Sequence, residues 1–355
     1  MTNPYQHLPA RNFWRTAVSG SRPGEFAGIW HPKFAITPAS RIATAGSCFA
    51  QHISQRLKAA GYAWVDSEPA PRTLTDDEAA AYGYGVFSFR TANIYTSSLL
   101  RQWVGAAVGV AALPDEVWEK DGRFCDPFRP TIEPNGYGSR EECLHARAYT
   151  LRCIRDALAR IDVLVFTLGL TESWRNRDGG YVYPACPGTL AGEFDPARHD
   201  FHNLSFNEIV EDLQTAFGQI RAINPGVRFL LTVSPVPLTA TASPDHVLAA
   251  TIYSKSVLRA VAGAMAQAAA DVDYFPSYEI IASHPSRGAF FDANLRTVAS
   301  AGVDTVMRTF FAAIGAQAEA RVDPAPSVPD NDVEEADTIC EDALLEAFAP
   351  GANQQ

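Results

Sequence analysis

Strand-like apolar runs alternate with amphipathic helical stretches through most of this 355-residue chain. The alternation constrains the fold more than any other feature, because strands that alternate with helices build a parallel sheet covered on both faces. The expected strands occupy residues 41–45, 162–168, 227–233 and 272–275. The expected helices, placed by their helical apolar period, occupy residues 49–60, 141–160, 205–223, 254–270 and 300–313. The sequence therefore predicts a three-layer α/β fold.

Two long stretches, residues 67–141 and 176–200, do not follow this pattern. They are rich in glycine, proline and aromatic residues and have no clean period. Long irregular segments inside a compact domain are usually functional or disordered, and the many aromatic side chains argue against disorder. We expect both stretches to be long loop insertions around a site.

The charge of the chain is concentrated at its C-terminal end. The formal net charge is −11, and the segment after Arg321 carries nine acidic residues and no basic ones, which leaves −2 for the remainder. A nearly neutral body argues against a broad nucleic-acid-binding surface. We expect an N-terminal extension over residues 1–30, an α/β domain over 31–321 and an acidic, disordered tail over 322–355.

The sequence also indicates the cellular compartment and whether disulfides or a metal site are expected. The first residues lack the apolar core of a secretory signal, and no later segment approaches the length of apolar chain that spans a membrane. We expect a cytoplasmic protein with no membrane partner and no nucleic-acid partner. The six cysteines are scattered, without a CxxC pair or a Cys/His zinc spacing, so we expect neither a disulfide framework nor a metal site.

Polar, reactive residues follow the expected strands, at the sheet edge where ligands bind in open α/β folds. The first strand runs into Gly46, Ser47 and Cys48, and a helix begins directly afterwards. A nucleophile in this turn meets unpaired backbone N–H groups and the positive end of a helix, which favour a thiolate or a developing oxyanion. The second strand is followed by residues 169–174 and the third by the proline-containing loop 234–239.

Six blocks of sequence resemble those of one known family. Residues 46–50 spell the pentapeptide GSCFA, and further blocks lie at residues 88–96, 126–130, 167–172, 232–236 and 274–279. On these residues the chain resembles the GSCFA family, which is assigned to the SGNH (GDSL-like) hydrolase superfamily. The resemblance covers about residues 30 to 312. It implies a flavodoxin-like parallel sheet with helices on both faces and long loop insertions.

The resemblance also assigns a nucleophile. The Gly-Asp-Ser turn of SGNH enzymes falls on Gly46, Ser47 and Cys48, which places Cys48 in the nucleophile register. A thiolate is a competent acyl-transfer nucleophile when a base or a helix terminus lowers its pKa. Ser47 is the alternative nucleophile, and a small buried core residue is the alternative role for Cys48.

An oxyanion site follows from two further SGNH blocks. The second block supplies a glycine N–H and falls on Ala92, before Asn93, and the Gly-x-Asn of the third falls on residues 169–171. The resemblance implies an oxyanion hole made of backbone N–H groups near Gly46, Ala92 and Gly169, completed by the hydroxyl of Thr171.

Several charged and aromatic residues in these blocks are candidate ligand-binding groups. Arg90, Arg129 and Lys255 are suited to bind a carboxylate, a phosphate or sugar hydroxyls. Glu172 lies beside Thr171, and Trp174 is typical of a carbohydrate platform. Structural ion pairs and core packing are the alternative roles for these side chains.

The general base is the least determined part of the site. The Asp-x-x-His of SGNH enzymes falls on residues 294–297, which are Asn-Leu-Arg-Thr and supply neither acid nor base. His284 and His246, which follow later strands, are the candidate substitutes. His52, four residues after Cys48, shares its helix face and is more typical of a packing or polarising neighbour.

The resemblance implies an esterase or O-acyltransferase that acts on an acylated glycan or glycoconjugate. The resemblance implies no cofactor, apart from an acyl donor such as acetyl-coenzyme A if the reaction is a transfer. The alternative is a non-catalytic module that binds a glycan or another small ligand and lacks the Asp-x-x-His pair. The sequence leaves the oligomeric state open.

Overall fold

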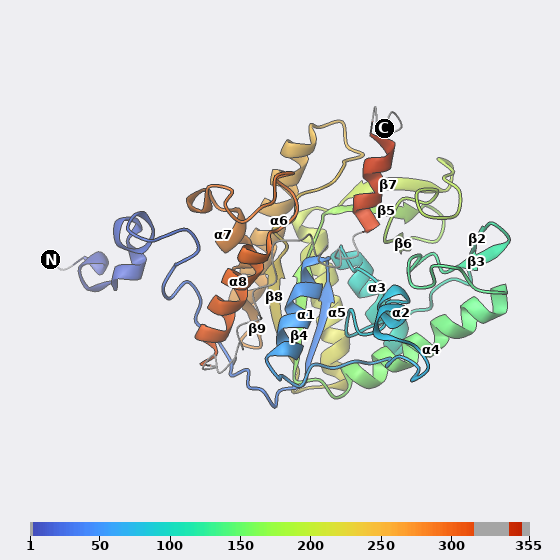
Figure 1. Cartoon of the computed structure of the whole chain (residues 1–355), viewed down its shortest axis with the longest axis horizontal. Helices are drawn as coiled ribbons and strands as arrows, with labels where there is room; N and C mark the ends of the chain where they lie inside the picture. Colours follow the sequence, from blue (N-terminus) through green and yellow to red (C-terminus); the bar gives the residue numbers. More distant parts are fainter. Residues whose placement is uncertain (1–2, 316–340, 350–355) are drawn as a thin grey trace, which may run out of the picture.

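The four predicted strands form one parallel sheet in the computed structural model, which describes residues 3–315 and 341–349. The strands lie in the order β1, β4, β8, β9 (Figure 1). Their bounds are β1 (Ile42–Gly46), β4 (Val163–Leu168), β8 (Arg228–Val233) and β9 (Val272–Tyr274). All four predicted strands are confirmed, to within a residue at each end.

The two faces of the sheet bury two separate apolar layers. Val163 and Val165 of β4 face one layer, and Leu164 and Phe166 face the other, so a continuous apolar run serves both, as expected for a parallel strand. The first face packs against α1 (Phe49–Ala59), α7 (Ser277–Ala282) and α8 (Ser300–Ala313). The second packs against α3 (Ser97–Val108), α4 (Arg140–Leu158), α5 (Phe206–Ile223) and α6 (Val247–Ala268). The fold is the predicted three-layer α/β architecture.

The first long stretch contains more regular structure than the sequence predicted. It forms α2 (Asp76–Ala81), α3, and a hairpin of β2 (Trp118–Lys120) and β3 (Arg123–Cys125). Thr96 caps α3 by accepting the N–H of Leu99, and Gly109 ends the helix with φ +80°. The Asp121-Gly122 pair between β2 and β3 is a standard hairpin signal, and both residues have positive φ. The expectation of a loop was therefore wrong for these segments, and α6 likewise begins earlier than predicted, at Val247.

The second stretch forms part of a small antiparallel sheet. Its order is β6, β5, β7, with bounds β5 (Glu172–Asn176), β6 (Val182–Tyr183) and β7 (His199–Asn203). Strand β5 begins four residues after β4 ends, so this sheet starts directly at the carboxyl edge of the parallel sheet. The insertion is thus anchored beside the expected site.

The N-terminal segment forms short helical turns at one end of the molecule, opposite α4 and the β2–β3 hairpin (Figure 1). Its turns are η1 (Pro4–His7), η2 (Ala10–Asn12) and the π-helical η3 (Arg15–Ser19). Trp30 then enters the core and donates its indole N–H to Asp273 at 3.2 Å. Within the described ranges, no helix has both the length and the apolarity needed to cross a bilayer.

The expected disordered tail lies mostly outside the described residues. Only 341–349 of that segment are described, and Glu341–Phe348 forms a 3-10 helix, η5.

Gly46 lets the end of β1 approach β4 closely. It has φ +133°, and a Cβ there would lie 2.3 Å from the carbonyl oxygen of Thr167. The next residue, Ser47, donates its backbone N–H to that same oxygen at 3.1 Å. A side chain at position 46 would therefore push the turn away from β4.

We expect Gly46→Ala to lower the free energy of unfolding by at least about 3 kcal/mol, because it adds backbone strain and a collision with main-chain atoms. Gly218→Ala is the matched control, since no heavy atom lies within 4 Å of a Cβ added to this glycine of α5. The control should raise stability by about 0.5–1 kcal/mol through helix propensity. Urea unfolding measures both changes, and equal stability of the two variants would contradict the expectation.

Candidate functional site

The turn after β1 places Cys48 at the N-terminus of α1. Cys48 is the N-cap residue, with helical backbone angles of φ −51° and ψ −31°, and its side chain makes no capping hydrogen bond. The first N–H groups of a helix lack intrahelical acceptors and carry partial positive charge. Cys48 is 5% exposed and Ser47 is 2% exposed. The Ser47 hydroxyl has no hydrogen-bond partner among the described residues.

Two other chain segments meet this turn. Ile94 donates its backbone N–H to the Gly46 carbonyl at 2.8 Å. A Cβ added to Gly169, after β4, would lie 3.0 Å from Ser47 Cβ and 3.0 Å from the Tyr95 carbonyl oxygen. The structure thus brings together the three blocks that the sequence assigned to one site.

Ala92 has the backbone conformation that the resemblance implied for a glycine. Its φ is +60°, in the left-handed region, which costs a residue with a side chain roughly 1–2 kcal/mol. Asn93 is fully buried beside it, and its side-chain oxygen lies 3.5 Å from the amide nitrogen of Gln51 on α1. The strained turn therefore holds Asn93 against the helix that carries Cys48.

The structure corrects the expected oxyanion donors. The N–H groups of Gly169 and Leu170 both donate to the Tyr95 carbonyl, at 3.1 and 3.0 Å, so the Gly169 N–H is already used. The Thr171 N–H donates to the Ser254 hydroxyl at 3.1 Å. The Thr171 hydroxyl, in contrast, is fully buried and has no partner within the described part of the chain. Two of the first N–H groups of α1 are also used, because Ala50 donates to the Ser47 carbonyl at 2.8 Å and Gln51 donates to the Cys48 carbonyl at 3.0 Å.

Helix α6 fixes the loop between β4 and β5. Lys255 is 1% exposed and donates from Nζ to the Gly169 carbonyl at 2.7 Å. Its neighbour Ser254 accepts the Thr171 N–H. Lys255 was a candidate anion-binding residue, and the structure shows that one of its contacts positions the loop.

Glu172 and Trp174 lie on β5. Glu172 accepts a hydrogen bond from the Thr241 hydroxyl at 2.5 Å, and burial raises the pKa of its carboxyl group. Trp174 packs edge-on against Phe194 and Phe201 of the insertion. The contacts of Trp174 make it part of the insertion's aromatic packing.

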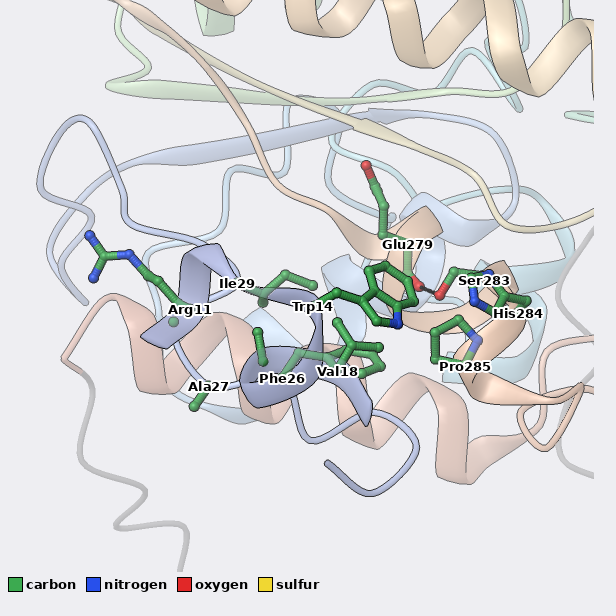
Figure 2. A pocket seen from close by; sticks show the side chains of 12 residues that line it. Arg11, Trp14, Val18, Phe26, Ala27, Ile29, Glu279, Ser283, His284 and Pro285 are labelled. Carbon is green, nitrogen blue, oxygen red and sulfur yellow. Dashed lines mark hydrogen bonds between the residues drawn. The ribbon is translucent and has the colours of Figure 1, made fainter. Parts of the chain in front are cut away.

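The two candidate bases have other roles in the structure. His246 is exposed and caps α6, where its Nδ1 accepts the N–H of Leu248 at 3.2 Å. His284, in η4 (His284–Ser286), stacks on Trp14 with ring centroids 5.3 Å apart. Figure 2 shows this pair in a pocket of about 430 Å³ that neither Ser47 nor Cys48 lines. No hydrogen bond recorded for residues 3–315 joins either imidazole to Ser47 or Cys48.

The register expected for Asp-x-x-His forms a local turn. The side-chain oxygen of Asn294 accepts the backbone N–H groups of Arg296 and Thr297, each at 2.9 Å. Its amide nitrogen donates to the Thr297 hydroxyl. These bonds stabilise the turn and supply no acid or base.

His52 is the histidine closest along α1 to Cys48. Its imidazole packs edge-on against Phe49, the residue after Cys48, with ring centroids 5.8 Å apart. Burial, and secondarily Arg56, lower the pKa of His52. The ring is therefore neutral at neutral pH and able to accept a proton.

Arg90 and Arg129 are structural. Arg90 is 5% exposed and pairs with Glu68 at 3.1 Å and Glu133 at 2.6 Å. Arg129 is fully buried, pairs with Asp126 at 2.9 Å and donates to the Arg90 carbonyl at 3.1 Å. The expectation that these guanidinium groups bind an anionic ligand is corrected, because their donors are engaged inside the fold.

We expect Arg90→Met to reduce the free energy of unfolding by about 3–5 kcal/mol, because it leaves the buried Glu68 carboxylate and the half-buried Glu133 carboxylate without their ionic partner. Arg56→Met is the control, since its ion pair with Asp304 is about half exposed and should contribute much less. Denaturant unfolding of both variants measures the difference. Similar losses in the two variants would refute the structural role of Arg90.

The fold and this site define an α/β protein with a cysteine at the strand–helix turn on the carboxyl edge of its parallel sheet. The family model described as "GSCFA family" matches residues 41–310, and the chain belongs to the GSCFA family. Among solved structures, the chain is similar to a Clostridium thermocellum family 3 carbohydrate esterase, with 11% identity and a TM-score of 0.31. That similarity covers 77% of this chain and 94% of the esterase. No curated protein matches the sequence.

Proposed function

We propose that this protein is an esterase or O-acyltransferase in which Cys48 is the nucleophile and the substrate is an acylated glycan or glycoconjugate. One observation carries the proposal: Cys48 lies at the N-terminus of α1, where residues 92–95 and 169–171 converge on the same turn. The positive end of a helix favours negative charge that develops on a bound acyl group there. The resemblance to SGNH hydrolases supports acyl chemistry and a glycan substrate.

The reaction proceeds through a thioester. Cys48 transfers its proton to a base, and its sulfur forms a bond to the ester carbonyl carbon. The carbonyl electron pair moves to oxygen, and the resulting oxyanion accepts hydrogen bonds from the Phe49 N–H at the start of α1 and from the Thr171 hydroxyl. Collapse breaks the ester C–O bond, and the protonated base returns its proton to the leaving alkoxide. Water then releases a carboxylate, or an acceptor hydroxyl takes the acyl group as a new ester.

We assign the base to His52 in place of His284 and His246. The His52 imidazole packs against Phe49, the residue after Cys48, and its lowered pKa keeps the imidazole neutral. His246 is engaged in capping α6, and His284 stacks on Trp14. Among the histidines weighed from the sequence, His52 therefore has the placement and the protonation state that a base requires.

The cysteine presents little surface to solvent. At 5% exposure, Cys48 reaches an acyl group only if the residues around the turn move to admit it. A site that closes again over the substrate excludes water and strengthens the hydrogen bonds to an oxyanion. An acyl donor such as acetyl-coenzyme A is required if the reaction is a transfer, and no other cofactor is part of the proposal.

A non-catalytic binding module is the second candidate function. It is favoured by the turn at residues 294–297, where Asn294 makes local bonds in place of an acid and a base. In that case the site would bind its ligand without turnover.

Replacement of Cys48 separates the two candidates. We expect Cys48→Ala to lower the hydrolysis rate of p-nitrophenyl acetate by about 10³-fold or more, because the variant lacks the nucleophile. Cys153→Ala, on α4, is the matched control and should keep the wild-type rate. Ser47→Ala should keep most of the activity if Cys48 is the nucleophile. Equal rates in wild type and Cys48→Ala would eliminate the proposed reaction.

Replacement of His52 tests the base. We expect His52→Gln to reduce the rate by about 10²-fold or more, whereas His246→Gln and His284→Gln change it little. The wild-type rate should fall only when the pH drops below the ordinary pKa of histidine, because His52 stays neutral above its lowered pKa. A rate profile against pH measures this limb. A larger loss in His246→Gln or His284→Gln than in His52→Gln would move the base to that residue.

A further inference from the structure

Two adjoining pockets lie beside the insertion sheet, between α3, α5 and strands β5 to β7. One encloses about 260 Å³ and includes Ser173 and Arg175, and the other encloses about 500 Å³ and includes Tyr181 and Gln219. They share five lining residues, which are Ser98, Arg101, Gly180, Val182 and Asp212. We call these two pockets together the lateral groove. The volume of the larger pocket lies in the range of small-molecule sites.

Each half of the lateral groove contains a buried polar atom without a partner. The hydroxyl of Ser173, a residue only 3% exposed, has no hydrogen bond among the described residues. The side-chain oxygen of Gln219 is likewise buried without a partner there. A buried polar group left unsatisfied is unfavourable, so two in one groove point to a ligand that supplies the missing bonds.

Most charged groups of the groove have ionic or hydrogen-bond partners, and Glu211, which is exposed, is the exception among the described lining residues. Arg101 pairs with Asp212 at 3.1 Å, and Asp212 also accepts the Ser97 hydroxyl at 2.9 Å. His202 lies 2.7 Å from Glu208. A strongly charged ligand would have to compete with these partners. A neutral ligand can form hydrogen bonds to the same side chains without breaking their ion pairs.

The lining is also mixed in polarity. Tyr181 and Val182 give the groove apolar surface next to the hydroxyl and amide groups. The Gln219 oxygen requires a donor, whereas the Ser173 hydroxyl can donate or accept. Sugar rings have this combination, with apolar C–H faces and a rim of hydroxyl groups that donate and accept.

We propose that the lateral groove is a binding site for a neutral saccharide chain. A sugar hydroxyl donates to Gln219 Oε1, a second exchanges a hydrogen bond with Ser173, and a C–H face packs on Tyr181. Ser173 is two residues beyond Thr171, and α3 begins two residues beyond Tyr95, so the groove adjoins the Cys48 turn along both segments. The groove's role as a substrate subsite rests on the proposed function, but saccharide binding does not.

The test is direct binding to the full-length Cys48→Ala protein, which cannot turn over an ester. The probes are cellotetraose, xylotetraose and chitotetraose, measured by calorimetry, with a neutral tetrapeptide as the competing class. We expect one saccharide to bind, with affinity at least tenfold weaker in Gln219→Leu and in Ser173→Ala. Gln214→Leu, the same substitution at an exposed position of α5, is the matched control and should keep the affinity.

A further variant tests the same groove in case Gln219→Leu or Ser173→Ala fails to fold. Gly105→Leu extends a side chain toward Gln219, whose amide lies 3.6–3.9 Å from a Cβ at that glycine. It should also abolish saccharide binding while the melting temperature shows a folded protein. Binding that is unchanged in all three groove variants, or binding of the peptide alone, or no binding of any probe, would overturn the inference. If saccharide binds but the wild type hydrolyses no ester, the proposed function is refuted, whereas the assignment of the groove as a saccharide site is supported.

Discussion

The close approach of Gly46 to Thr167 is the constraint on which the site depends. It brings the end of β1 within hydrogen-bond distance of β4. The next two residues, Ser47 and Cys48, therefore lead into α1 at the edge of the sheet. The Tyr95 carbonyl then accepts two N–H groups from the loop after β4 and locks that loop beside Ser47. Three distant segments therefore share one small volume because the backbone of each bonds to the next.

The parallel sheet could be predicted because its strands are buried on both faces and read as short apolar runs. Val163–Leu168 is the clearest case. Helix α3 was missed because its helical pattern lies inside a stretch dominated by glycine and aromatic residues. The β5–β7 sheet was missed because its strands, such as His199–Asn203, are mostly polar and half-buried, and their pairing is non-local.

The position of Cys48 followed from the sequence, since a turn between a strand and a helix is a local feature. The roles of the histidines and arginines did not, because each depends on partners far away in the chain. Arg90 pairs with Glu133, which lies 43 residues further along the chain, and the hydrophobic periodicity of a sequence does not predict such a contact. The Gly169 N–H was misassigned for the same reason: its acceptor, Tyr95, belongs to another segment.

The buried ionic cluster of the first insertion has a consequence for how this protein can change over time. Its carboxylates, Glu68, Asp126 and Glu133, balance the guanidinium groups of Arg90, Arg129 and Arg147. Loss of a fully buried member such as Asp126 or Arg129 would leave an opposite charge in the interior, so a single replacement is expected to destabilise the fold even where the whole set could be exchanged for apolar residues. Because Arg147 lies on α4, a chimera that exchanges the insertion with a relative should transfer Arg147 of α4 with it.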